Sequence, residues 1–128
     1  MERKIQIQAG PVTATAVLNT SDTATAIWEA LPITARASTW GDEIYFSIPV
    51  QRPVDNGQDV VALGDLGYWP PGHAFCIFFG PTPMSTGDEI RPASAVNLVG
   101  RLEGDSSAFR KVTSGAPVRL SVHDESQR

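Results

Sequence analysis

The segment from Gly64 to Gly80, GDLGYWPPGHAFCIFFG, constrains the fold more than any other part of this chain. Ala74–Phe79 is apolar at every position, which is typical of a central strand covered on both faces. Leu66–Trp69 reads as a second strand that Pro70-Pro71-Gly72 stops, because proline cannot donate to a sheet ladder. We expect Gly72 to take a positive φ and to reverse the chain, with Tyr68 and Trp69 pointing to opposite sides. Two neighbouring strands joined by a tight corner therefore lie at the centre of the sheet.

Short strands with alternating side chains predict β-structure on both sides of this centre. Lys4–Ala9 and Val12–Leu18 alternate across Gly10-Pro11 and predict an opening hairpin. Further strands are expected at Asp42–Ile48, Val60–Leu63, Ala95–Glu103, with Gly100 at a bulge or close approach, and Val118–Val122.

Two short helices interrupt the β pattern. Ala24, Ile27, Trp28 and Leu31 are spaced i, i+3, i+4 and i+7, with Ser21 or Asp22 as N-cap and Pro32 at the end. A second helix is expected from Asp105 to Val112, and Pro81–Pro92 reads as a long loop. The sequence therefore predicts a mainly β protein: a closed antiparallel β-barrel with one or two short capping helices, since closure removes exposed strand edges.

The size and charge of the chain limit its possible functions. Its 128 residues suit one domain, assigned to residues 1–123 with a polar tail at 124–128. The net charge of -4 argues against binding nucleic acid or an anionic membrane. The start Met1-Glu2-Arg3-Lys4 lacks the apolar run of a secretory signal, and Cys76 is the only cysteine, so we expect a cytoplasmic protein with no intrachain disulfide.

Three segments in this order resemble the small prokaryotic cyclophilin-like family. They are TWGDEIYFSIPV (Thr39–Val50), Gly64–Gly80 and PASAVNLVGRLEG (Pro92–Gly104). The resemblance covers roughly Lys4 to His123 and implies a cyclophilin-like β-barrel related to peptidyl-prolyl isomerases. It also implies an activity to consider, prolyl isomerisation, in which an arginine donates to the proline amide beside an apolar pocket. Arg36, on the segment Ile33–Thr39, is the candidate for that catalytic arginine, and Phe75 or Phe79 for the pocket phenylalanine.

A second functional hypothesis comes from the aromatic residues themselves. Tyr and Trp pair a large apolar body with one polar group, which suits a pocket for an extended peptide or a small ligand. Phe75 and Phe79 could equally fill the barrel interior. We therefore expect a non-catalytic binding module, with prolyl isomerisation as the alternative, and the oligomeric state is left open. The predicted ligand-binding residues are Trp40, Tyr45, Tyr68, Trp69, Phe75 and Phe79, beside the Pro81–Pro92 loop.

Other chemistry finds little support in the residue pattern. His73 and Cys76 are three positions apart, so on a strand they point to opposite faces and cannot share a metal ion. The pairs Asp42-Glu43 and Asp88-Glu89 are expected to be solvated at turns, and Cys76 to be buried and unreactive. No metal or cofactor is expected.

Overall fold

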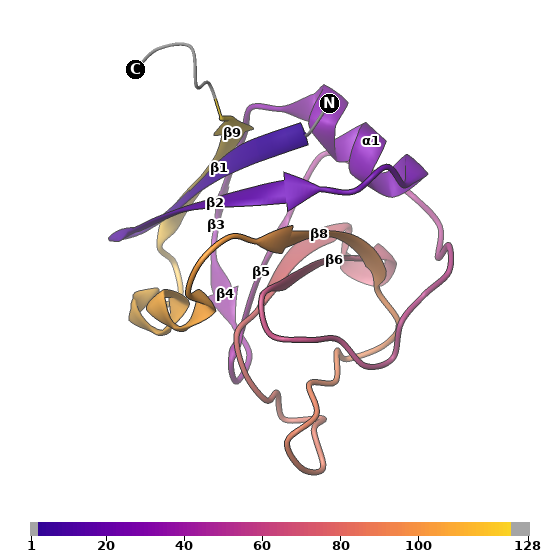
Figure 1. The fold of residues 1–128 in the computed structure, drawn as a ribbon, viewed down its shortest axis with the longest axis vertical. Coiled ribbons are helices and arrows are strands. Elements are labelled where there is room, and N and C mark those ends of the chain that lie inside the picture. The colour runs from indigo at the N-terminus through magenta and orange to yellow at the C-terminus, as the bar shows by residue number, and fades with distance from the viewer. Residues whose placement is uncertain (1–2, 124–128) are drawn as a thin grey trace.

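Nine antiparallel strands form one sheet that curls into a nearly closed barrel in the computed structural model, which describes residues 3–123 (Figure 1). The predicted mainly β barrel is confirmed, while the tail predicted at 124–128 lies outside the described residues. The strands are β1 (Arg3–Ala9), β2 (Val12–Leu18), β3 (Ile33–Arg36), β4 (Ser38–Thr39), β5 (Glu43–Ser47), β6 (Asp65–Trp69), β7 (Ala74–Phe78), β8 (Asn97–Leu102) and β9 (Pro117–Val122).

One stretch of chain brings the two edges of the sheet together. The strands are ordered β3-β9-β1-β2-β8-β6-β7-β5-β4, so β3 and β4 lie at opposite edges although only Ala37 separates them in the sequence. The Ala37 amide donates to the Ala116 carbonyl at 2.8 Å, and the Gly115 amide donates to the Ala37 carbonyl at 2.7 Å. Residues 33–39 thus pair with β9 through β3 and with β5 through β4.

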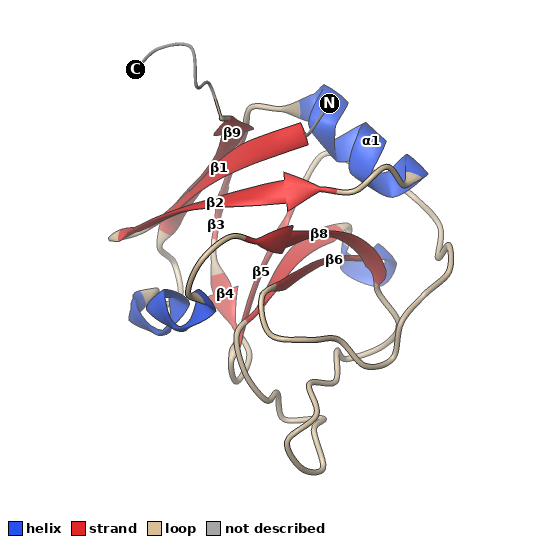
Figure 2. Cartoon of the chain, viewed as in Figure 1, coloured by secondary structure: helices blue, strands red, loops and turns tan. Residues whose placement is uncertain are grey.

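Helices cover the ends of the barrel, as the sequence predicts (Figure 2). Helix α1 (Asp22–Ala30) begins at Ser21, whose side chain accepts a hydrogen bond from the Ala24 amide at 3.2 Å. Its buried Ala24 and Ile27 join the main core. The other two helices are the 3₁₀ segments η1 (Pro70–Gly72) and η2 (Ser106–Lys111), the latter capped by Asp105 and burying Phe109.

The strands β5, β6 and β7 have two buried faces. On the inner face, Ile44, Phe46, Phe75 and Ile77 belong to the main core, and the rings of Phe46 and Phe75 stack at 5.4 Å. On the outer face, Cys76 and Phe78 belong to a smaller apolar cluster that includes Val96. All five residues of β7 are buried, which confirms the predicted central strand. The segment 80–96 supplies part of the cover on the outer face.

Glycine positions explain two local features and correct one prediction. A Cβ on Gly100 would collide with the Val17 carbonyl oxygen, so the predicted close approach is confirmed. The residue with positive φ after the two prolines is His73, at 48°, and not Gly72 as expected. Gly72 is needed for a different reason, because a Cβ there would lie 2.8 Å from a ring carbon of Trp69.

Two further observations complete the fold. The strand expected at Val60–Leu63 is reduced to a single bridge between Val61 and Ile90, so that prediction is wrong. Within residues 3–123, no helix has the length and apolar character needed to cross a bilayer.

Candidate functional site

A pocket of about 210 Å³ opens on the outer face of β5 and β6, under the end of segment 80–96. We call it the aromatic pocket, because three aromatic rings contribute to its wall. Its lining residues are Trp40, Glu43, Tyr45, Trp69, Pro92, Ala93 and Val96.

The three rings come from three places in the chain. Trp40 follows β4, Tyr45 lies in the middle of β5 and Trp69 ends β6, and each is half-buried. The Trp69 indole Nε1 donates to the Ser94 hydroxyl at 2.7 Å, which ties the ring to the covering segment. The Trp40 amide donates to the Glu43 carbonyl at 2.9 Å and so closes the turn into β5. The structure therefore brings together three of the six aromatic residues assigned to the cleft from the sequence.

The other three aromatic residues lie in the core. Tyr68 is 0% exposed, and its hydroxyl donates to the Val50 carbonyl at 2.5 Å and accepts from the Arg52 amide at 3.2 Å. The Phe75 ring is also fully buried, stacked in the main core. The Phe79 ring packs 6.4 Å from that of Phe109, with the Arg110 guanidinium 5.9 Å from its centroid. The expected alternation is confirmed, since Tyr68 points inward and Trp69 lines the pocket.

Glu43 is the functional candidate that the sequence reasoning missed. We expected the Asp42-Glu43 pair to be solvated, but Glu43 is only 5% exposed and lines the aromatic pocket. Its Oε1 atom is buried and accepts no hydrogen bond from a described nitrogen or oxygen, while the weakly donating Cys76 thiol lies within hydrogen-bonding reach of the carboxyl group. Burial raises the pKa of this carboxyl to about 7, and the neighbouring Cys76 thiol opposes part of that rise. Asp42, by contrast, is partly exposed and pairs with Arg110 at 3.0 Å.

A signal for this burial was present in the sequence. Ala74–Phe79 is apolar on both faces, so the outer face of the sheet must be covered there. Glu43 pairs with Phe78 and Tyr45 pairs with Cys76, so both residues of β5 share that covered face. A carboxyl on a covered face either pairs with a cation or stays protonated to a higher pH than a solvated carboxyl does.

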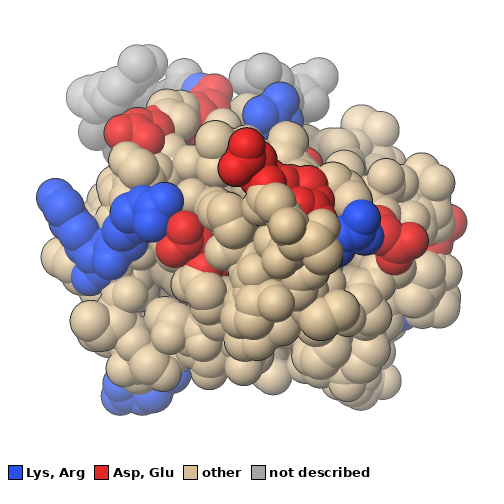
Figure 3. Space-filling model, turned by 90° about the horizontal axis from the view of Figure 1, so that it is seen from below, with Lys and Arg blue, Asp and Glu red and all other residues tan. Residues whose placement is uncertain are grey.

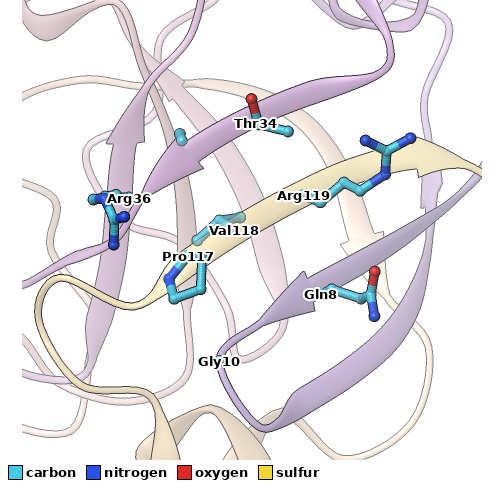
Figure 4. A pocket seen from close by; sticks show the side chains of 8 residues that line it. Gln8, Gly10, Thr34, Arg36, Pro117, Val118 and Arg119 are labelled. Atoms are coloured by element: carbon cyan, nitrogen blue, oxygen red, sulfur yellow. The ribbon is translucent and has the colours of Figure 1, made fainter.

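The predicted catalytic arginine lies elsewhere. Arg36 is exposed at the end of β3, where its Nη1 donates to the Gly115 carbonyl at 3.0 Å. It borders a larger hollow of about 550 Å³ on β1, β3 and β9, at the opposite end from Arg119 (Figure 4). The residues that line this hollow include no aromatic side chain: Gln8, Gly10, Thr34, Ala35, Arg36, Pro117, Val118 and Arg119. The arginine and the aromatic rings are therefore parts of two separate surfaces.

Comparison with known proteins identifies the family. The family model described as "Cyclophilin-like" matches residues 3–121. The chain belongs to the cyclophilin-like family. Its fold is similar to the solution structure of the hypothetical protein AF2241 from Archaeoglobus fulgidus, with 40% identity, a TM-score of 0.81 and 95% of each chain covered.

A more distant structural relative of this cyclophilin-like chain is McbB, solved in complex with tryptophan. The identity is 14% and the TM-score 0.66, and the match covers 94% of this chain but only 45% of McbB. That likeness shows a shared fold. No curated protein matches the chain significantly.

The structure also shows where the other residues with potential chemistry lie. No group of three His, Cys, Asp or Glu side chains within residues 3–123 could hold a metal ion. Cys76 is buried as predicted, and its burial, together with the Glu43 carboxylate, raises the pKa of its thiol well above the usual range.

Seen from below, the surface carries interspersed acidic and basic side chains among larger uncharged areas (Figure 3).

Proposed function

We propose that this cyclophilin-like domain is a binding module whose aromatic pocket holds a small organic ligand. The observation that carries the proposal is the combination of three half-buried aromatic rings with a buried carboxyl oxygen that accepts no hydrogen bond from a described nitrogen or oxygen. Ligand sites are commonly concave and apolar, with a few placed polar groups that fix the orientation of the ligand. The aromatic pocket has this composition, whereas the hollow beside Arg36 does not.

The volume of the pocket limits the size of the ligand. Sites for drug-sized molecules usually enclose roughly 300–1,000 Å³, whereas the aromatic pocket encloses about 210 Å³. A compact molecule or one side chain of a peptide therefore fits better than a long peptide segment. McbB, 45% of which matches this fold, has been solved in complex with tryptophan, a compact aromatic molecule of the size proposed here.

The proposal can be tested by blocking the pocket with a matched pair of variants. Ala93→Phe adds a ring to an exposed position on the pocket wall, whereas Ala62→Phe adds the same ring at an exposed position outside the lining set. Small aromatic fragments should shift the indole NMR signals of Trp40 and Trp69 and leave that of Trp28, on α1, unchanged. Ala93→Phe should abolish these shifts and Ala62→Phe should preserve them. Binding that perturbs some other surface in both variants would overturn the proposal.

A further inference from the structure

The chemistry of the aromatic pocket also indicates the class of its ligand. Resting on the proposed function, we propose that the ligand is a protonated primary or secondary amine on a compact apolar body. Its N–H group would donate to Oε1 of Glu43, and the rings of Trp40, Tyr45 and Trp69 would contact the cation and the body.

The first argument is the unsatisfied carboxyl oxygen. A buried acceptor without a donor costs free energy, and a buried carboxylate costs more unless a cation pairs with it. Among the described residues, no cation forms a salt bridge with Glu43. Arg110 pairs instead with Asp42 at 3.0 Å, and Arg91 pairs with Glu89 at 2.9 Å. A ligand ammonium supplies both the missing donor and the missing charge.

The second argument is the composition of the walls. The faces of Trp and Tyr rings attract cations through their quadrupole, and the attraction grows when the site is shielded from water. Glu43 pairs with Phe78 on β7 and has the Cys76 thiol as a neighbour, and the pocket that it lines is completed by Trp40, Tyr45, Trp69, Pro92, Ala93 and Val96. None of these side chains is positively charged. A ligand carboxylate or phosphate would meet the Glu43 carboxylate without a compensating cation.

The third argument is the protonation state of the two partners. An alkylamine has an ordinary pKa near that of lysine, about 10.4, so it is a cation throughout the neutral range. Burial raises the pKa of Glu43 to about 7, so its carboxylate fraction increases between pH 6 and pH 8. The neighbouring groups are the Cys76 thiol, whose pKa lies well above the usual range, and the Tyr45 phenol. Amine affinity should therefore increase with pH across this range.

The experiment uses two probes of equal size and the full chain. 2-Phenylethylamine is a cation and 2-phenylethanol is its neutral match, and both are titrated at pH 8 while the indole signals of Trp40 and Trp69 are followed by NMR. A charge-assisted hydrogen bond in a partly buried site should make the amine bind at least about tenfold more tightly. The preference should shrink at pH 6 and disappear in Glu43→Gln. The exposed Glu29→Gln on α1 is the control and should keep it.

The outcomes separate this inference from the proposed function. Equal binding of amine and alcohol in the pocket, or an amine preference that survives in Glu43→Gln, overturns the amine assignment and leaves the binding module standing. Failure of both probes to perturb Trp40 and Trp69 overturns both. A third arm identifies the source of the amine. If a blocked peptide with one lysine binds more tightly than 2-phenylethylamine, the amine belongs to a protein partner. If the peptide binds more weakly, the ligand is a free small molecule.

Discussion

The two faces of β5 and β7 are built from adjacent residues and behave differently. The inner face carries Phe46 and Phe75, which stack in a core without a polar side chain between them. The outer face carries Glu43 and Tyr45, which line a pocket, and Cys76, which is buried beneath the irregular segments that cover this face. Strand alternation produces both faces. Only the inner face is closed by other strands of the barrel, so it acts as a core while the outer face can admit a ligand.

The largest expected effect is on the inner face. Phe75→Ala removes a fully buried, stacked ring and should lower the free energy of unfolding by about 3–5 kcal/mol. Tyr45→Ala on the outer face removes a half-exposed ring and should cost less than half as much. Urea unfolding followed by circular dichroism measures both. Equal losses would show that the outer face is as essential to the core as the inner one.

The next effect is the pH dependence that Glu43 gives to stability. Between its ordinary pKa of 4.5 and its raised pKa of about 7, the native state keeps a proton that the unfolded chain has released. The contribution of the protonated carboxyl is fully present below pH 4.5 and is lost as the pH rises through 7. The shift corresponds to about 3 kcal/mol across that window.

Glu43→Gln should remove this dependence. Between pH 4.5 and pH 8, the free energy of unfolding of the natural protein should fall by the contribution of Glu43, and that of Glu43→Gln should not show this fall. The exposed Glu29→Gln should leave the pH profile unchanged. Coincident profiles for all three proteins would mean that Glu43 titrates as a solvated carboxyl.

A smaller effect is expected at the corner that carries Trp69. Gly72→Ala places a Cβ 2.8 Å from the Trp69 ring, so the ring must move. We expect a loss of about 1–2 kcal/mol and a shifted Trp69 indole signal. Gly87→Ala, where the nearest atom is 3.5 Å away, is the matched control and should change neither. An unshifted indole signal in Gly72→Ala would show that the ring does not depend on glycine beneath it.

The smallest effect is expected at Arg36. This exposed residue makes one hydrogen bond to a backbone carbonyl and is not among the residues that line the aromatic pocket. Arg36→Ala should change stability by about 0.5 kcal/mol or less and leave fragment binding in the pocket unchanged. In a protease-coupled assay, a proline peptide should undergo cis-trans exchange at the same rate with Arg36→Ala as with the natural protein. Loss of such an activity would show that the hollow on β3 and β9 is a functional site after all.

The inner face was predictable because it depends on local alternation. Ile44, Phe46 and Ile48 were expected on one side of the strand predicted at Asp42–Ile48, and all three are buried. The apolar run in β7 likewise indicated a strand covered on both faces, and it is one. Helix α1 followed from its stripe and its Ser21 cap. In each case, residues within a few positions of one another determine the outcome.

The outer face was harder to predict because its cover comes from distant parts of the chain. Pro92, Ala93 and Val96 reach β5 and β6 across the end of a long irregular segment, and no periodicity specifies how such a segment folds back. Glu43 therefore resembled an ordinary turn carboxyl, and Tyr68 could not be distinguished from its half-buried neighbour Trp69. The sequence therefore predicted that the site is aromatic, but which aromatic residues line the pocket depends on how the distant covering segment folds over the sheet.

The position of Cys76 makes the chain's single thiol a reporter of barrel opening. The side chain lies between the sheet and its outer cover, and the pKa of its thiol is far above the usual range because of burial and the nearby Glu43 carboxylate. The reactive thiolate is therefore scarce as long as β5 and β7 remain paired. Labelling by a thiol reagent must wait for a transient opening of this part of the sheet, so the labelling rate measures how often the opening occurs. A ligand that occupies the pocket would slow the same reaction and reveal its own binding without any attached probe.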